Sequence, residues 1–488
     1  MLNFKKKTMK KIFYLFVTSL ALTAVSCDNN FEEINVSPNA SQVTDPNLLL
    51  SSTITVTQNT IYNMQIGGDM GMCWAQHVSK VQYNDEENYI PRRALMNALW
   101  SNLYSGVIAE SKSAYTLAGD AGNNNLQAAA LIMQANAFQI LADVYGPIPF
   151  TEAVVLGNTK PAHDSQEVVY DGILGLLDQA DALLASGSGS ITPSADLLYG
   201  GDMSKWRKFG KSLKLKALMR ISGKRNVSAE VQALVSSGLL MSSNSDSAQL
   251  VYTAAQPDAN PIYETIVFST RGEYKVSSVL VNNLLGNGDP RLGVYAKKNN
   301  ANLYVGNLPG VENPSNYNAF SSLGTKYLDP TLPGVILSYA QVEFLLAEAA
   351  NKNLITGGKV AALGFYQEGI KANMLFNGLT ALDASTYYGQ PAITFDPLTA
   401  SDALVNQKIG TQVWLALYGQ GIEAWTEWRR TGYPALAPAA NAPSSQPTIP
   451  SRFYYSTDSQ NTNQANYAAA AATLTNGDTM SSKVWWMN

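Results

Sequence analysis

The feature that most constrains the fold is a helical spacing of apolar residues that recurs along the chain. Residues 126–145 are rich in Ala and end at Gly146-Pro147, a pair that stops a helix because proline cannot continue the hydrogen-bond ladder. Comparable spacing predicts helices over 164–185, 338–350 and 360–373. Stretches rich in Asn, Ser, Gly and Pro separate them, over 241–335, 375–407 and 432–483. We therefore expect an all-α-dominated fold of helix pairs, with long loops that carry function or small elements of their own.

Local signals predict where several of these helices begin. Asp164-x-x-Glu167 is typical of a capping box, and Asp202 is placed to cap the next helix. Residues 414–430 predict one Trp-rich helix. Six basic residues on the helix after Asp202 predict a solvated face: Lys205, Arg207, Lys208, Lys211, Lys214 and Lys216.

The N-terminus is typical of a targeting segment. Five lysines precede an apolar run over 12–25, which is shorter than the ~20 residues that span a membrane and fits a signal peptide. Translation from either Met1 or Met9 is compatible with this pattern. Ala24-Val25-Ser26-Cys27 resembles the lipobox of bacterial lipoproteins, which implies cleavage before Cys27 and lipid attachment to that cysteine. The alternative is an ordinary secretory signal. We expect residues 1–26 to be the signal peptide, 27–47 a lipidated tether and 48–488 a single domain.

Composition excludes several classes of protein. The formal net charge is −4, and loss of residues 1–26 lowers Lys plus Arg from 33 to 28 against 37 acids, which gives about −9. An acidic chain of this kind argues against nucleic-acid binding. Two His and two Cys exclude a disulfide scaffold, an iron–sulfur cluster and a Cys-based zinc site. Beyond Cys27 the other cysteine, Cys73, is expected to be a buried thiol.

Signatures of catalysis are absent from the sequence, which lacks His-Glu-x-x-His and Gly-x-Ser-x-Gly. Glu423 and Glu427 share a helix face and offer a glycosidase-like carboxylate pair. Because Arg429 and Arg430 follow them, an ion-paired structural helix is the preferred interpretation. We expect that the protein is not an enzyme and binds no cofactor. A bound structural cation is compatible with the sequence.

Two segments carry the residue types that bind sugars, whose apolar C–H faces stack on aromatic rings and whose hydroxyls bond polar side chains. Residues 74–92 and 263–276 combine Trp, Tyr, Asn, Gln, Asp and Arg. Tyr is common both in sugar-binding surfaces and in hydrophobic cores. Composition alone therefore does not decide whether these segments bind a ligand or pack in the interior.

Seven blocks, in order, are similar to the SusD/RagB family of outer-membrane lipoproteins, and within it to the SusD-like 2 branch. These blocks are residues 31–39, 142–150 (ADVYGPIPF), 289–292 (DPRL), 338–349, 423–434 (EAWTEWRRTGYP), 452–455 and 484–486. The resemblance implies an α/α superhelical fold with four degenerate tetratricopeptide-like helix pairs and long irregular loops.

The resemblance also implies function and location. It implies a lipid-anchored protein on the exterior of the outer membrane that acts as the lid of a SusC-like TonB-dependent transporter and delivers oligosaccharides to it. A peptide ligand is the alternative, and a surface glycosidase a remote one. The shared blocks include no ligand-binding motif, so ligand-binding candidates come from region and residue type alone. They are Trp74, Tyr83, Asn84, Asp85, Tyr89, Arg271 and Tyr274.

Overall fold

The computed structural model describes residues 44–487. Residues 45–487 belong to one compact unit. Cys27, the signal peptide and most of the predicted tether lie outside the described residues. Within the described part, no helix combines the length and the apolar character needed to cross a membrane.

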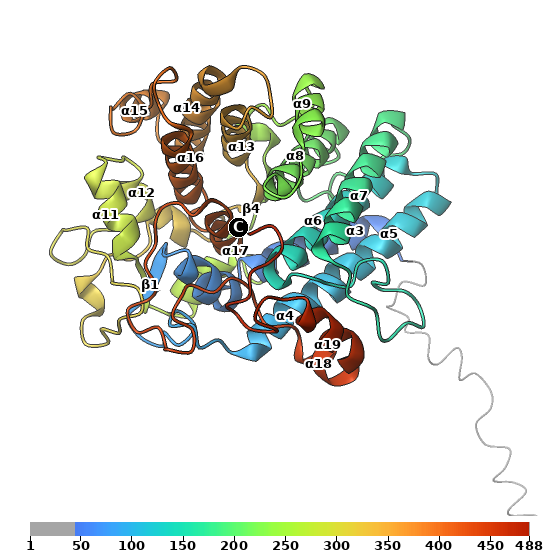
Figure 1. The fold of residues 1–488 in the computed structure, drawn as a ribbon, viewed down its shortest axis with the longest axis horizontal. Coiled ribbons are helices and arrows are strands. Elements are labelled where there is room, and N and C mark those ends of the chain that lie inside the picture. The colour runs from blue at the N-terminus through green and yellow to red at the C-terminus, as the bar shows by residue number, and fades with distance from the viewer. Residues whose placement is uncertain (1–43, 488) are drawn as a thin grey trace, which may run out of the picture. The chain divides into compact units, whose positions relative to one another are not determined.

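Helices dominate the described chain (Figure 1). Those in the first half are α3 (Pro46–Ile61), α4 (Arg93–Leu103), α5 (Ala109–Asp120), α6 (Asn124–Tyr145), α7 (Gln166–Ser186), α8 (Met203–Ile221) and α9 (Ser228–Ser236). Those in the second half are α10 (Pro261–Tyr263), α11 (Ser278–Gly286), α12 (Leu292–Tyr295), α13 (Tyr339–Asn351), α14 (Gly358–Phe376), α15 (Ala381–Tyr388), α16 (Asp402–Ala416), α17 (Gly421–Thr431), α18 (Thr457–Thr462) and α19 (Gln464–Ala472). The expected helix-rich fold is confirmed, with α6 against α7 and α13 against α14 as closely packed pairs. The number of tetratricopeptide-like pairs stays a prediction.

Two small antiparallel sheets lie among the helices. β1 (Val78–Lys80) pairs with β3 (Tyr274–Val276), and β2 (Ala248–Leu250) pairs with β4 (Gly334–Leu337). Most apolar side chains of the helices form one large core, and a second cluster of buried side chains lies around β1, β3, α11 and α12. The predicted long loops thus carry α10 to α12, α15, α18, α19 and three strands.

The sequence predicted two helix N-caps, of which the structure confirms one and contradicts the other. Asp202 caps α8 by accepting from the N–H groups of Ser204 and Lys205 at 3.0 and 3.2 Å. The prediction that Asp164 opens the next helix is wrong, because Ser165 caps α7 and Asp164 accepts from the backbone N–H of Phe150 at 2.9 Å.

The predicted Trp-rich helix over 414–430 is two helices. α16 ends at Ala416 and α17 begins at Gly421, because Gly419 between them has a φ of +90°, a conformation that continues no right-handed helix. The expected solvated face of α8 is also partly wrong. Lys216 is buried against Glu423, and Lys211 and Lys214 pair with the α7 residues Asp181 and Asp178.

Close backbone contact joins α17 to a π-helical segment, Met64–Met72, that precedes β1. A Cβ atom at Gly71 would lie 2.5 Å from the carbonyl carbon of Gly421, so only glycine allows this approach. The contact fixes the start of the segment that carries Trp74, Tyr83 and Tyr89. Cys73, at the end of the π-helical segment, is buried as expected, and burial raises the pKa of its thiol.

Candidate functional site

The β1–β3 pair brings together the two segments that the sequence singled out. Lys80 lies opposite Tyr274 in the register, so the residues after β1 face the residues before β3. As a result the Arg271 guanidinium carbon lies 6.0 Å from the centre of the Tyr83 ring. These residues are nearly 190 positions apart in the chain, and the antiparallel pairing is what makes them neighbours.

Tyr83 projects outward from this pair. Its side chain is 61% exposed, and its φ of +58° is unusual for a bulky residue. Thr270, beside Arg271, also has a positive φ, of +54°. Strained backbone of this kind persists only where the surrounding structure holds it and is concentrated at functional sites.

A third segment completes the exposed surface. The Tyr317 hydroxyl donates to Gln82 Oε1, and the Lys275 ammonium lies 5.6 Å from the centre of the Tyr317 ring. We call Gln82, Tyr83, Arg271 and Tyr317 the Tyr83 surface; Lys275 itself is buried, at 7% exposed, and supports the Tyr317 ring. Two rings flanked by an amide and a guanidinium provide both stacking faces and hydrogen-bond donors.

Glu273 fixes Arg271 within this surface. The Arg271 Nε donates to Glu273 Oε1 at 2.6 Å, and the hydrogen bond raises the pKa of the guanidinium. Arg271 therefore stays charged, and its side chain is still 38% exposed.

Beneath the Tyr83 surface lies a buried polar cluster around Asp69. The Asp69 carboxylate lies 3.1 Å from Lys80 Nζ and accepts from the Tyr274 hydroxyl at 2.7 Å. Burial raises the pKa of Asp69, although Lys80 and Tyr274 act in the opposite direction. The cluster ties the π-helical segment to both strands and so holds the strands that position Tyr83 and Arg271.

Three of the candidate aromatic residues lie in the interior. Trp74, Tyr89 and Tyr274 are between 1% and 3% exposed. The Trp74 indole N–H donates to the Glu86 carbonyl at 2.8 Å, and the Tyr89 hydroxyl accepts from the Ala439 N–H at 2.7 Å. Their polar atoms are satisfied within the protein, and their burial leaves no ring face for a ligand in this conformation.

The two remaining candidates adjoin Tyr83. Asp85 is exposed, whereas Asn84 is 6% exposed and its Nδ2 has no hydrogen-bond partner in the described part of the chain. The sequence analysis missed Lys275 and Tyr317. Tyr317 lies in a stretch rich in Asn and Ser without periodicity, and its place beside Gln82 depends on tertiary pairing.

The carboxylate pair on α17 is held by cations. Glu423 lies 3.0 Å from Lys216 Nζ and 2.9 Å from an Arg220 nitrogen, and Glu427 lies 2.7 Å from an Arg430 nitrogen. Burial acts to raise the pKa of Glu423, but Lys216 and Arg220 outweigh it and lower the pKa. A general acid for glycoside cleavage needs a raised pKa, so this ion-paired helix does not suit that role.

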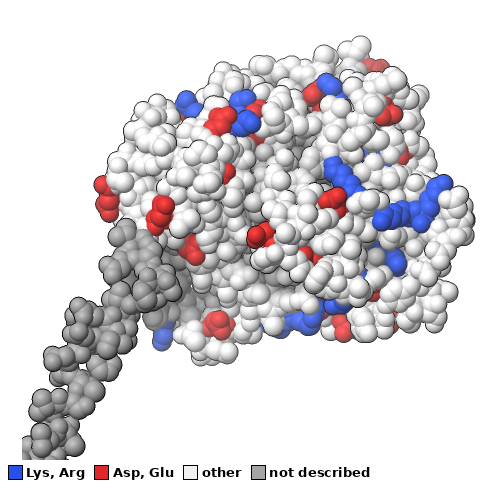
Figure 2. All heavy atoms as spheres, turned by 180° about the vertical axis from the view of Figure 1, so that it is seen from behind, with Lys and Arg blue, Asp and Glu red and all other residues white. Residues whose placement is uncertain are grey.

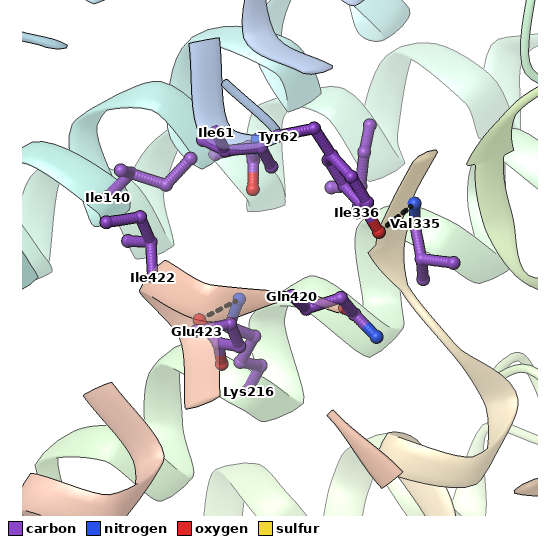
Figure 3. Close-up of a pocket in the computed structure, with 10 residues that line it drawn as sticks. Ile61, Tyr62, Ile140, Lys216, Val335, Ile336, Gln420, Ile422 and Glu423 are labelled. Carbon is purple, nitrogen blue, oxygen red and sulfur yellow. Dashed lines mark hydrogen bonds and ion pairs between the residues drawn. The ribbon is translucent and has the colours of Figure 1, made fainter. Parts of the chain in front are cut away.

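A small cavity adjoins Glu423 (Figure 3). Its volume of about 30 Å³ suits a water molecule and is far below that of a sugar. The close-up shows Lys216 bonded to Glu423 on one side and Tyr62 bonded to Val335 on the other. The cavity is therefore not a ligand site.

Charge and metal-binding groups are sparse over the described residues. Figure 2 shows a face on which basic and acidic side chains are scattered among a majority of uncharged ones. Within residues 44–487, no cluster of three or more His, Cys, Asp or Glu side chains is placed to hold a metal ion.

Known structures share this architecture. A chitin-binding protein is 28% identical with a TM-score of 0.81, and the match covers 91% of this chain and 100% of that one. A SusD-like protein from Bacteroides thetaiotaomicron is 26% identical with a TM-score of 0.78, covering 91% and 99%. A chitin-binding SusD homologue from Flavobacterium johnsoniae, at 23% identity, a TM-score of 0.79 and coverage of 90% and 98%, shares the fold.

No curated protein matches the sequence. Residues 38–456 match the model of the SusD-like 2 family, described as starch-binding and associating with the outer membrane. The chain therefore belongs to the SusD-like 2 family of outer-membrane-associated, starch-binding proteins.

Proposed function

We propose that this protein is a cell-surface lipoprotein that binds oligosaccharide nutrients and delivers them to a SusC-like TonB-dependent transporter, acting as its lid. Proteins of the SusD-like family are binding proteins rather than enzymes. The ion-paired state of Glu423 and Glu427 agrees with a role in binding.

The Tyr83 surface is the observation that carries the glycan proposal. It presents an exposed ring, a half-buried ring, a fixed guanidinium and an amide, all held by a sheet and a buried polar cluster. Pairs of aromatic rings contribute about 0.5–1.5 kcal/mol beyond area burial, and we expect a sugar face stacked on the Tyr83 ring to contribute a comparable amount. The family description and the chitin-binding relative point to starch-type or chitin-type oligosaccharides as first probes.

Anchoring and partnership are further parts of the proposal. The lipobox-like ending at Cys27 supports a lipid anchor, and family membership supports an outer-membrane location. Metabolic labelling with a palmitate analogue should label the wild-type chain and not Cys27→Ala. Affinity purification from solubilised outer membranes should recover a SusC-like transporter, and repeated recovery of the chain without one would contradict the lid role.

Calorimetric titration with chitin-derived and starch-derived oligosaccharides tests ligand binding. We expect Tyr83→Ala to weaken binding about tenfold, because the exposed ring is removed while the core stays intact. Tyr454→Ala is the matched control, since Tyr454 also packs against an arginine, Arg93, whose guanidinium carbon lies 4.4 Å from its ring centre. Equal loss in both variants would contradict the site. Binding of peptides with no response to any glycan would favour the peptide-binding alternative.

A further inference from the structure

The side chains around β3 divide between two faces, because successive residues of a strand point in opposite directions. Tyr274 points to the buried cluster, where its hydroxyl donates to Asp69 at 2.7 Å. Glu273 and Lys275 flank Tyr274 and therefore lie on the opposite face, where the Tyr83 surface is. The Val81 N–H donates to the Glu273 carbonyl at 3.0 Å, so the pairing with the segment after β1 extends to Glu273.

Glu273 is a buried acid beside two cations. It is 3% exposed, its Oε1 accepts from Arg271 Nε at 2.6 Å, and the same oxygen lies 2.5 Å from Arg271 Nη2. Burial lowers the pKa of Lys275, and Glu273 acts in the opposite direction. One carboxylate therefore offsets the charge of the guanidinium in the Tyr83 surface and of the ammonium that supports the Tyr317 ring.

The other charges beside the Tyr83 surface are acidic. Asp85, two residues after Tyr83, is exposed, and so is Glu312. Burial raises the pKa of Tyr317, and the charges of Glu273 and Glu312 raise it further, which places both carboxylates close enough to act on that ring. An anionic ligand would meet these carboxylates together with a guanidinium whose charge is already balanced.

The geometry of the Arg271 pair also limits what the guanidinium can bind. Arginine binds a carboxylate most strongly through two parallel N–H bonds. Glu273 already engages Nε and Nη2, so that edge of the guanidinium is not open to a carboxylate of a ligand. Nη1 is not engaged by Glu273, and a single donor of this kind suits a sugar hydroxyl.

We infer that Glu273 sets the charge preference of the Tyr83 surface: by pairing with Arg271 it makes the surface select neutral oligosaccharides over oligosaccharides that carry carboxylates. The inference rests on the proposed glycan binding and adds to it the class of glycan. Glu273 acts through Arg271 and does not itself need to touch the ligand, so it is a positioning residue.

A matched pair of ligands tests this preference. The neutral probe is the chitin-derived or starch-derived oligosaccharide that the wild type binds, and the acidic probe is the same oligosaccharide with its C6 hydroxyls oxidised to carboxylates. Calorimetric titration gives the ratio of the affinity for the acidic probe to that for the neutral probe. We expect a ratio below one in the wild type at low salt, and a ratio about fivefold higher in Glu273→Gln, the size expected of a partly exposed ion pair.

Two controls separate charge from packing. Arg271→Gln/Glu273→Gln removes the released guanidinium as well, so its ratio should return close to that of the wild type. Salt near 1 M should abolish the increase seen in Glu273→Gln, because it screens charges beyond about 3 Å. A general loss of structure would weaken binding of both probes and would not raise the ratio.

An unchanged ratio in Glu273→Gln, with the neutral probe still bound, would overturn the role of Glu273 and leave the proposed function standing. The wild type alone also tests the inference, should Glu273→Gln fail to fold. Tighter binding of the acidic probe than of the neutral one by the wild type at low salt would overturn it. Failure of the wild type to bind any neutral or acidic probe would overturn the proposed function and this inference together.

Discussion

Replacing Asp69 with Ala should show how strongly the candidate glycan surface depends on the polar cluster beneath it. The carboxylate is 1% exposed and lies 3.1 Å from the ammonium of Lys80, whose side chain is 2% exposed. Loss of one partner from a buried ion pair costs about 3–5 kcal/mol, because the other charge is left unpaired in the interior. The Tyr274 hydroxyl also loses its acceptor. We therefore expect Asp69→Ala to lower the free energy of unfolding by about 3–5 kcal/mol.

Urea denaturation monitored by tryptophan fluorescence measures this loss. Asp171→Ala is the matched control, because its ion pair with Arg225 is exposed, with side chains 56% and 32% accessible, and such pairs contribute about 0–1 kcal/mol. The double variant Asp69→Leu/Lys80→Met removes both charges and should recover most of the stability. If Asp69→Ala costs no more than Asp171→Ala, or if the double variant is no better than the single one, the reasoning about the buried pair fails.

Two further predictions concern the packing and charge of α17. Gly71→Ala places a Cβ 2.5 Å from the Gly421 backbone, so it should either abolish soluble folded protein or lower the free energy of unfolding by about 3 kcal/mol or more. The control is Gly175→Ala on α7, whose Cβ meets nothing within 4 Å and which should be neutral or stabilising in thermal denaturation. For Glu348, burial acts to raise the pKa, but Arg430 and Lys352 outweigh it and lower the pKa from its ordinary value of 4.5 to about 2. Its contribution, up to about 3 kcal/mol, is present above pH 4.5 and lost as the pH falls toward 2. Glu348→Gln should therefore be less stable than the wild type at pH 7, with a gap that narrows below pH 4.5; a gap independent of pH would refute this assignment.

Helices were predictable because their signals are local. The apolar spacing of 126–145 and the cap at Asp202 act within one or two turns, so sequence alone places them. The break at Gly419 was missed because glycine tolerates both helical and left-handed backbone, and packing decides between them.

The candidate site was only partly predictable. The segments around Tyr83 and Arg271 were identified by residue type, but their pairing depends on a two-stranded sheet between distant parts of the chain. Trp74 and Tyr83 have the same sugar-binding character in sequence, yet one is buried and the other exposed. That difference is set by the tertiary packing of Trp74 against Trp425 and Phe453, which no local pattern reports.

The Tyr83 surface is assembled from segments far apart in the chain, and this has a consequence for the order of folding. The hydrogen bond between Tyr317 and Gln82 joins residues 235 positions apart, and β3 lies between them in the chain. Contacts of such separation form late, since loop closure must precede them. The helices, whose contacts are local, are therefore expected to form before this surface does, and a single cleavage between residues 82 and 317 would divide the surface between two fragments.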